Sequence, residues 1–358
     1  MKIAHIPSCV LATLRDGVII PALPLALTAH RQLDERRQKA LIRYYLDAGA
    51  GGVAVGVHAT QPAIRKPEFG LLKPVLQLAA ETMDRSCAKN KRAVLKVVGV
   101  YGRTRQAAAE ISMAHDLGYH ACLPNLSAFP EDGIPALIAH CQELARHMPL
   151  IGCYDPPALG GRPLPYEFWR EFVEIENVLA INVAVGTRHQ TLDVVRAICD
   201  AGRHKEITLY TGNADHLVLD LLQEYRIPHP DGARRMRFKG GMLGHWSVWT
   251  HSAVQLLERL HRAVRSSKSV SHELLTQAAV FTECHAAITD AANNHTRYLP
   301  GLHEVLRRQG LLQNTLCLDP QSVLSTSQAT EIERILCAYP DLSDDVFVQN
   351  NLACWLRD

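Results

Sequence analysis

The sequence predicts an α/β fold: a (β/α)8 TIM barrel followed by a C-terminal helical extension. Short apolar segments alternate eight times with amphipathic segments up to residue 264, and only helical patterns follow residue 265. A length of 358 residues suits one barrel with a tail and requires no second independent core. We therefore divide the chain into a barrel, residues 1–265, and an extension packed on it, residues 266–358. The expected junction is the stretch SSKSVS at 266–271.

The eight predicted strands are short apolar runs, typical of parallel strands that are buried on both faces. They are expected at residues 17–23, 53–57, 93–98, 120–124, 150–154, 178–185, 207–211 and 240–248. The helices of the barrel are expected at residues 34–48, 69–89, 104–117, 133–147, 166–175, 190–201, 214–225 and 252–264. In the first helix, apolar residues recur on one stripe, and glycines follow its end.

The rest of the chain divides into a loop and a tail. A polar loop with Pro228, Pro230 and Gly232 is expected between the seventh helix and the eighth strand. The extension should hold helices at residues 273–293, 302–309 and 328–338. Residues 344–358 contain apolar side chains but no pattern that predicts an element.

Composition excludes several classes of protein. The net charge is +2 with scattered charges and no basic stripe, so nucleic acid is not an expected partner. Ten cysteines are spread singly without a C-x-x-C pair, which argues against a zinc finger or a disulfide framework and fits a reducing cytoplasm. No apolar run approaches the roughly 20 residues that span a bilayer.

One segment near the N-terminus resembles an export signal. Residues 18–27 read VIIPALPLAL and precede Thr28-Ala29, which is similar to a secretory core and cleavage site. Two prolines interrupt the run, and Arg15-Asp16 before it is not a purely basic region. We therefore expect a cytoplasmic protein.

Polar residues gather where the predicted strands end, which is where barrels carry their active sites. They are His58, Thr60, Asn125, Tyr154, Asp155, Asn182, Gly212, Asn213, Asp215 and His245. Asn182 is the one polar residue in the apolar run VLAINVAVG, residues 178–186. A buried amide without a partner costs about 1–3 kcal/mol. Asn182 is therefore either satisfied by polar neighbours in the core or directed into a ligand site.

Several segments resemble the dihydrodipicolinate synthase and N-acetylneuraminate lyase family, over roughly residues 17–336. Cys153-Tyr154-Asp155-Pro156-Pro157 is similar to the family's Y-N-x-P turn after strand five. The segment 177–186 is similar to its strand six, and 211–215 to its S-G-x-D turn. Similarity extends to residues 17–24, 49–56, 121–124, 241–248 and 310–312.

The resemblance implies a barrel with a helical tail that acts as a class I aldolase and assembles as a homo-oligomer, a dimer or tetramer. In that family a strand-six lysine forms a Schiff base with a 2-oxo acid such as pyruvate. A tyrosine after strand five relays the proton, and a threonine pair in a G-x-T-G-E turn after strand two holds the carboxylate.

The carry-over onto this sequence is partial. Tyr154 keeps the position of the relay tyrosine, and Gly56 keeps the first glycine of the strand-two turn. Val57 and His58 replace the threonine pair. The later glycine and glutamate of that turn become Ala59 and Thr60.

Two further positions depart from the family. Asn125 and Leu126 stand where the family has tyrosines after strand four. Asn182 occupies the position of the Schiff-base lysine, and an amide nitrogen is not a nucleophile that can form an imine.

Two replacements for the lysine stay open. Lys96 lies in the third strand among apolar residues that would lower its pKa, and Lys239 precedes Gly240-Gly241. A metal held by His58, His245, Asp155 and Asp215 would also polarise a carbonyl. The histidines have no H-x-H or H-E-x-x-H spacing, so neither metal nor cofactor is expected.

The resemblance favours an enzyme of the lyase or aldolase type that acts on a small oxo acid or sugar acid without a Schiff base. Its expected catalytic residues are Tyr154 and Asn182. The expected substrate-binding residues are Gly56, Val57, His58, Thr60, Asn125, Gly212, Asn213 and His245. The alternative is a catalytically inactive ligand-binding or structural barrel of the same family.

Overall fold

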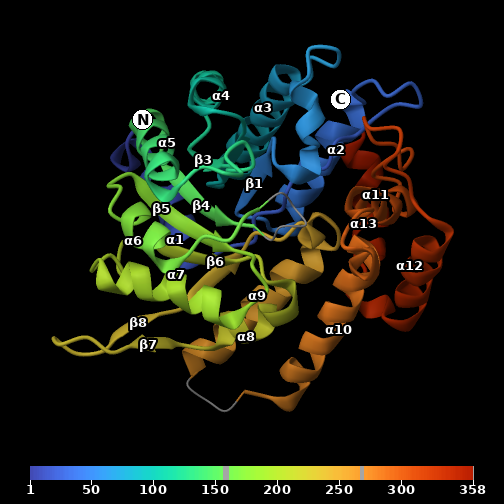
Figure 1. The fold of residues 1–358 in the computed structure, drawn as a ribbon. Helices are drawn as coiled ribbons and strands as arrows, with labels where there is room; N and C mark the ends of the chain where they lie inside the picture. The colour runs from blue at the N-terminus through green and yellow to red at the C-terminus, as the bar shows by residue number, and fades with distance from the viewer. Residues whose placement is uncertain (156–160, 267–269, 358) are drawn as a thin grey trace.

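The fold was analysed in a computed structural model, which describes residues 1–155, 161–266 and 270–357. Within these residues, seven parallel strands form one curled sheet in the order β1-β2-β3-β4-β5-β6-β9 (Figure 1). The strands are β1 Gly52–Val55, β2 Leu95–Val100, β3 Ala121–Pro124, β4 Leu150–Tyr154, β5 Val178–Val183, β6 Thr208–Thr211 and β9 Phe238–Gly241.

The segment that was predicted as the first strand closes this sheet into a barrel. Ile19 forms a parallel bridge with Gly241 on β9, and Ala22 forms one with Ala54 on β1. The segment makes only these isolated bridges, but it fills the eighth strand position between the two ends of the sheet. The predicted (β/α)8 barrel is thereby confirmed.

Helices that follow the strands cover the outside of the barrel (Figure 1). They are α2 Glu35–Ala48, α3 Leu72–Asn90, α4 Thr104–Asp116, α5 Ile134–His147, α6 Tyr166–Phe172, α7 Arg188–Asp200, α8 Leu217–Leu222 and α9 Thr250–Ser266. The sequence also explains the ends of α2: the Asp34 carboxylate accepts a hydrogen bond from the backbone N–H of Arg37, and Gly49 adopts the left-handed conformation that ends the helix.

The N-terminal end of the barrel is filled by a helix that the sequence analysis did not predict. Helix α1, Ser8–Asp16, buries Val10 and Leu14. Together with Ile6 these side chains join the apolar cluster inside the barrel, which includes Leu95 on β2 and Tyr210 on β6. The Tyr210 hydroxyl donates a hydrogen bond to the carbonyl of Leu14 at 2.8 Å. This end of the barrel is therefore packed with side chains.

Residues 214–248 differ from the prediction. The seventh helix is shorter than expected and begins with the 3₁₀ turn Ala214–His216 before α8. The expected polar loop is an antiparallel hairpin, β7 Tyr225–Ile227 and β8 Arg234–Met236, with the prolines between its strands. The predicted eighth strand is also wrong in its second half, because β9 ends at Gly241 and a 3₁₀ helix follows at His245–Ser247.

The C-terminal extension is helical and packs along one side of the barrel (Figure 1). Its helices are α10 His272–Thr289, α11 Tyr298–Arg308, α12 Thr326–Ala338 and α13 Asp345–Trp355. Helix α13, for which no pattern was found, packs against α2: the Trp355 indole N–H donates to Asp47 at 2.7 Å. Residues 267–269 of the expected junction lie outside the described part of the chain. No helix in the described residues is both long and apolar enough to cross a bilayer.

Candidate functional site

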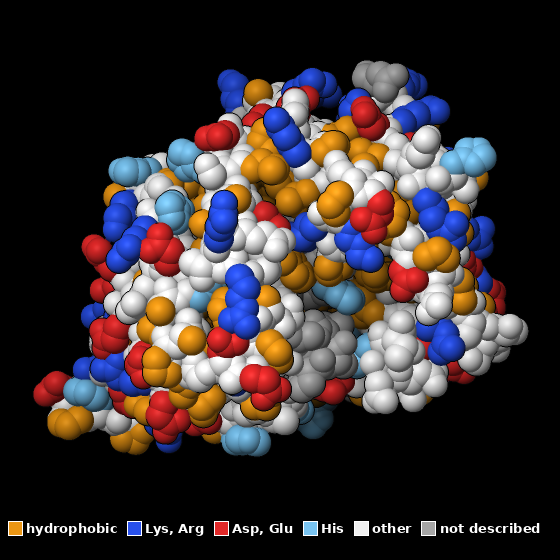
Figure 2. All heavy atoms as spheres, turned by 45° about the horizontal axis from the view of Figure 1, so that its top comes forward, with side chains coloured by type: hydrophobic (Ala, Val, Ile, Leu, Met, Phe, Trp, Pro, Cys, Tyr) orange, Lys and Arg blue, Asp and Glu red, His pale blue; other side chains and the backbone are white. Residues whose placement is uncertain are grey.

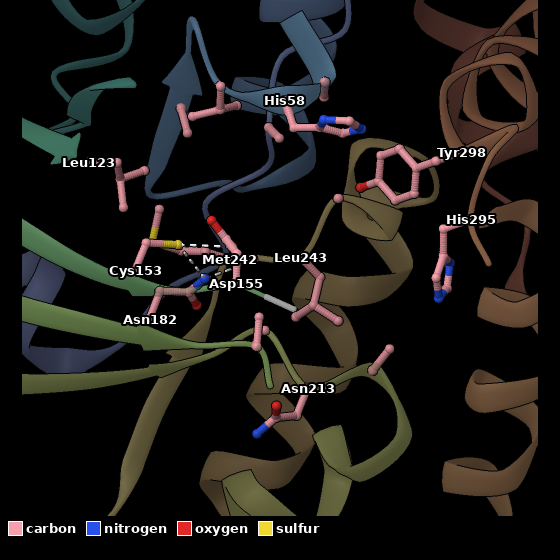
Figure 3. Close-up of a pocket in the computed structure, with 18 of the residues that line it drawn as sticks. His58, Leu123, Cys153, Asp155, Asn182, Asn213, Met242, Leu243, His295 and Tyr298 are labelled. Carbon is pink, nitrogen blue, oxygen red and sulfur yellow. Dashed lines mark hydrogen bonds between the residues drawn. The ribbon is translucent and has the colours of Figure 1, made fainter. Parts of the chain in front are cut away.

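A cavity of about 280 Å³ opens at the C-terminal ends of the strands, where α10 and the residues that follow it form part of its wall (Figure 3). Its polar lining comes from turns after several strands and from the tail. These residues are His58, Tyr101, Asn125, Cys153, Asp155, Asn182, Asn213, Asp215, His285, His295 and Tyr298. The loops and the extension thus jointly enclose a compartment of the size of a small metabolite.

Asn182 and Cys153 stand side by side on the barrel wall of the cavity (Figure 3). They are register partners on β5 and β4. The Asn182 amide nitrogen lies 3.4 Å from the carbonyl oxygen of Met242 and 3.9 Å from the Cys153 sulfur. The amide oxygen of Asn182 has no hydrogen-bond partner among the described residues, although Asn182 is only 4% exposed. An acceptor is therefore available for a hydroxyl or N–H of a ligand.

Asp155 lies next to this pair at the end of β4. The Cys153 thiol donates a hydrogen bond to its Oδ1 at 3.1 Å. Burial raises the pKa of the Asp155 carboxyl, while the bond from Cys153 opposes that shift. Burial, and then the Asp155 charge, raise the pKa of the Cys153 thiol well above its usual value. The hydrogen bond between the Cys153 thiol and the Asp155 carboxyl group therefore lies at the cavity wall.

Aromatic and imidazole groups form the opposite wall. The rings of His58 and Tyr298 meet edge to face with centroids 5.2 Å apart (Figure 3). The ring centroids of His285 and His295 are 6.0 Å apart. Burial lowers the pKa of His58 to about 4. Burial, together with the neighbouring His245 and His295, lowers the pKa of His285 well below its usual value. His58 and His285 are therefore neutral at pH 7.

The lining of the cavity contains no lysine or arginine among the described residues. Lys96, the first alternative for the Schiff-base lysine, points to the helix layer and pairs with Asp84 at 2.7 Å. Lys239, the second, lines a separate hollow with Arg15 and Lys205. Side chains alternate between the two faces of a strand, and Lys96 lies on the opposite face from the inward Leu95 and Val97. Among the described residues, neither lysine therefore lines the cavity.

The predicted placement of Tyr154 in the site is wrong. Its ring packs on Trp169 of α6 with centroids 5.2 Å apart, and its hydroxyl accepts a hydrogen bond from the backbone N–H of Leu164. Ile151 and Cys153 are the β4 residues that face the barrel interior. The Tyr154 side chain therefore points out of the barrel. Cys153 lies in the cavity where the resemblance had placed the tyrosine.

Three predicted binding residues lie outside the cavity lining. The Thr60 hydroxyl accepts a hydrogen bond from the backbone N–H of Gly56 and donates one to the carbonyl of Leu23, so it holds the turn in place. Gly56 has a left-handed φ of 74° and shapes that turn. His245 is buried in the 3₁₀ helix after β9, behind His285, with ring centroids 5.6 Å apart.

The other predicted binding residues do line the cavity: Val57, His58, Asn125, Gly212 and Asn213. Asn213 is already bonded, since its amide oxygen accepts from the Gly186 N–H and its nitrogen donates to the buried Asp220 at 3.0 Å. Asp155 and Asp215 were expected at the mouth but not among the binding residues. Tyr101, Cys153, His285, His295 and Tyr298 were not predicted, and the last three have no sequence signal because they come from the tail.

Tyr101 and Tyr298 add two phenol groups to the cavity. Burial is the main cause that raises the pKa of each phenol, and the Asp155 charge contributes to both. Tyr298 can lie over the mouth because its hydroxyl occupies the space that a side chain at residue 244 would need, and residue 244 is a glycine. Both phenols are therefore protonated donors near Asp155.

Among the described residues, no three His, Cys, Asp or Glu side chains come close enough together to hold a metal ion. His58 and Asp155 both line the cavity, but His245 is behind it, so the set considered from the sequence is not assembled as a lining cluster. The chemistry available from the described residues is proton transfer, hydrogen bonding and a thiol.

We predict that His245 makes the protein sensitive to acid. Burial lowers the pKa of His245 to about 4, against about 6.5 in an unfolded chain. Between these values the unfolded state binds the proton and the folded state does not, so the free energy of unfolding falls as the pH falls from 6.5 to 4. This histidine should contribute a loss of about 3 kcal/mol at pH 4. Urea unfolding of His245→Gln at several pH values should show a shallower decline; an unchanged decline would contradict the assignment.

Fold and site together define a (β/α)8 barrel with a small-molecule site at the carboxyl ends of its strands. Residues 16–224 match the dihydrodipicolinate synthetase family. The match covers more than half of the chain, and the chain belongs to this family. The family is of the lyase and aldolase type, and its members act on small oxo and sugar acids. A comparison with curated proteins finds no match.

Solved structures with the same fold include enzymes of this family. N-acetylneuraminate lyase from Fusobacterium nucleatum, complexed with pyruvate, has a TM-score of 0.70 and 16% identity over 92% of this chain and 98% of its own. The Clostridium difficile protein CdNal, in complex with mannosamine, has a TM-score of 0.70 and 14% identity over 90% and 99%. Dihydrodipicolinate synthase from Oceanobacillus iheyensis has a TM-score of 0.68 and 15% identity over 93% and 99%. At these identities the likeness is one of fold.

Proposed function

We propose that this protein binds a small oxo acid or sugar acid at the mouth of its barrel and carries out lyase-type chemistry without a Schiff base. The observation that carries the proposal is Asn182. It occupies the strand position that the resemblance assigns to the lysine, it lines the cavity, and no lysine of the described part of the chain lines the cavity beside it. An amide cannot form an imine, so the carbonyl of the ligand must be activated in another way.

Hydrogen-bond donors around the cavity support activation of a carbonyl. A carbonyl oxygen that gains negative charge during carbon–carbon cleavage is stabilised by donors that are already in place. The Asn182 amide nitrogen and the phenols of Tyr101 and Tyr298 are such donors. Asp155 lines the cavity and accepts the S–H hydrogen bond of Cys153, so it is placed to transfer a proton, and burial raises its pKa. These groups replace the imine and the tyrosine relay in our proposal.

Borohydride trapping tests the proposal directly. Borohydride reduces an imine between pyruvate and a lysine to a stable amine, which adds mass to the protein. We expect no such increase in the native protein after incubation with pyruvate and borohydride, because no lysine among the described residues lines the cavity. Intact-protein mass spectrometry with peptide mapping makes the measurement. A stoichiometric adduct on any lysine would overturn the proposal; absence of binding by every oxo acid and sugar acid tried would favour the inactive barrel.

We further propose that the protein is a cytoplasmic homo-oligomer, a dimer or a tetramer. The support is the family relationship for assembly and the ten cysteines, which are all free thiols, for a reducing compartment. Light scattering that reports a mass of only 39.7 kDa would contradict the proposed assembly.

A further inference from the structure

The cavity contains a nucleophile that the proposed function does not use. Cys153 faces the cavity beside Asn182, because the two residues are register partners on the neighbouring strands β4 and β5 (Figure 3). Among the residues that line the cavity, Cys153 is the only thiol. It stands next to the position that the resemblance assigns to the covalent lysine.

A base is in contact with this thiol. Asp155 Oδ1 accepts the S–H hydrogen bond at 3.1 Å, and both groups line the cavity. Burial and the Asp155 charge both raise the pKa of the thiol, so the resting pair holds a neutral thiol beside the Asp155 carboxylate. A thiol in this state becomes a nucleophile only when a base removes its proton during attack. Asp155 is positioned for that step.

The site also contains a polar atom that a ligand could bind, the amide oxygen of Asn182. This oxygen has no partner in the described part of the chain, although it is buried and belongs to a cavity-lining residue that is 4% exposed. The amide nitrogen of the same side chain lies 3.9 Å from the Cys153 sulfur. A hydroxylated carbonyl compound would satisfy the amide oxygen through a hydroxyl group while its carbonyl carbon lies near the sulfur.

We propose that the Cys153 thiol adds reversibly to the carbonyl carbon of the bound small molecule, with Asp155 as the base. The Sγ–C bond forms and the π bond of the C=O group breaks, with its electron pair moving to oxygen. The S–H proton passes to Asp155, and Asp155 returns it to the new alkoxide. The product is a neutral hemithioacetal or hemithioketal, and no oxidant or reductant is needed. This step rests on the proposed function, because it requires that the cavity binds a carbonyl compound.

Uncharged hydroxyaldehydes and 2-oxo acids both have a carbonyl group that the thiol could attack. The charges around the cavity should make one class react more than the other. The lining has Asp155 and Asp215 but no lysine or arginine among the described residues, and the nearby Arg65 is paired with Glu110 at 3.0 Å. A carboxylate next to the carbonyl would therefore lack a cationic partner. An uncharged hydroxyaldehyde needs no such partner, so we expect it to give more adduct than a 2-oxo acid; it serves here as a probe of the thiol and not as the proposed substrate.

The experiment is native mass spectrometry of the whole protein with D-glyceraldehyde or pyruvate. A hemithioacetal adds the full mass of the aldehyde, whereas an imine adds that mass less one water. We expect a full-mass adduct with glyceraldehyde, less with pyruvate, and loss of both in Cys153→Ala. The matched control is Cys122→Ala, since Cys122 is buried on the neighbouring β3 and does not line the cavity. It should keep the adduct.

Asp155→Asn provides a second measurement if Cys153→Ala fails to fold. The amide keeps the shape of the carboxylate but cannot take the proton, so adduct formation should slow about 100-fold. Binding itself is followed separately by calorimetry. Glyceraldehyde or pyruvate that binds without any full-mass adduct, or an adduct that survives Cys153→Ala, would overturn the inference and leave the proposed function standing. An imine on a lysine would overturn the proposed function instead.

Discussion

Replacing Asn182 with lysine is expected to create an imine with pyruvate that the native protein cannot form. The new amine would enter the cavity from β5, where burial among apolar neighbours lowers its pKa and increases the neutral, nucleophilic fraction. Borohydride should then fix pyruvate on residue 182 of the variant, with no adduct on the native protein. Turnover should stay low, because Val57 and His58 replace the threonine pair and Tyr154 faces away from the cavity.

The control for this gain of imine formation is the variant Asn125→Lys. Asn125 also lines the cavity, but from the loop after β3, so the same new amine is placed elsewhere in the compartment. Mass spectrometry followed by peptide mapping should find the adduct on residue 182 alone. Equal labelling at residue 125 would mean that any cavity amine reacts, and that the β5 position has no special geometry.

Arg65→Met is expected to lower the free energy of unfolding by about 3–5 kcal/mol. The Arg65 side chain is 9% exposed and pairs with Glu110, which is 7% exposed. It also donates to the carbonyl oxygens of Gly56 and Gly99, at the ends of β1 and β2, and its guanidinium lies over the Tyr101 ring at 4.2 Å. Removing it leaves the buried Glu110 carboxylate without its cation, with the Tyr101 N–H and the Gln106 amide still donating to it. The two carbonyl groups lose the hydrogen bonds from Arg65.

Urea unfolding measures this effect, and the chain supplies a matched control. Arg85 pairs with Glu81 at 3.6 Å, but the two side chains are 74% and 51% exposed. Arg85→Met should therefore change the free energy of unfolding by less than about 1 kcal/mol. The double variant Arg65→Met/Glu110→Gln should recover part of the loss, because it removes the unpaired charge. Equal small effects of the two arginine substitutions would contradict the role of Arg65.

The alternation of apolar segments was enough to predict the barrel, because each strand–helix unit leaves its own local pattern. The strand at Leu150–Tyr154 was predicted with the same bounds as β4. The apolar pattern did not indicate which side chains of a strand point into the barrel and which point out toward the helices. Residues on both faces of a parallel strand are apolar, so nothing in the run LIGCY indicated that Cys153 points inward and Tyr154 outward.

The candidate site was predicted only where it is built by turns after strands. Asn125 and Gly212 lie at such positions and do line the cavity, as does Asn182 near the end of β5. Tyr298 and His295 reach it from the tail, and a contact of that kind depends on how distant segments pack.

The surface charge also follows the sequence. On the face drawn in Figure 2, Lys and Arg are interspersed with Asp and Glu, which agrees with the scattered charges of the sequence.

The pairing that closes the barrel also imposes an order on biosynthesis. Ile19 on the first strand bonds with Gly241 on the last, so the edge at residues 17–23 has one of its two neighbours only after nearly the whole barrel has left the ribosome. Contacts between segments so distant in sequence form slowly, and unpaired strand edges promote aggregation. The nascent chain therefore carries an open edge for most of its synthesis, and its yield in cells should depend on chaperones and on the rate of translation.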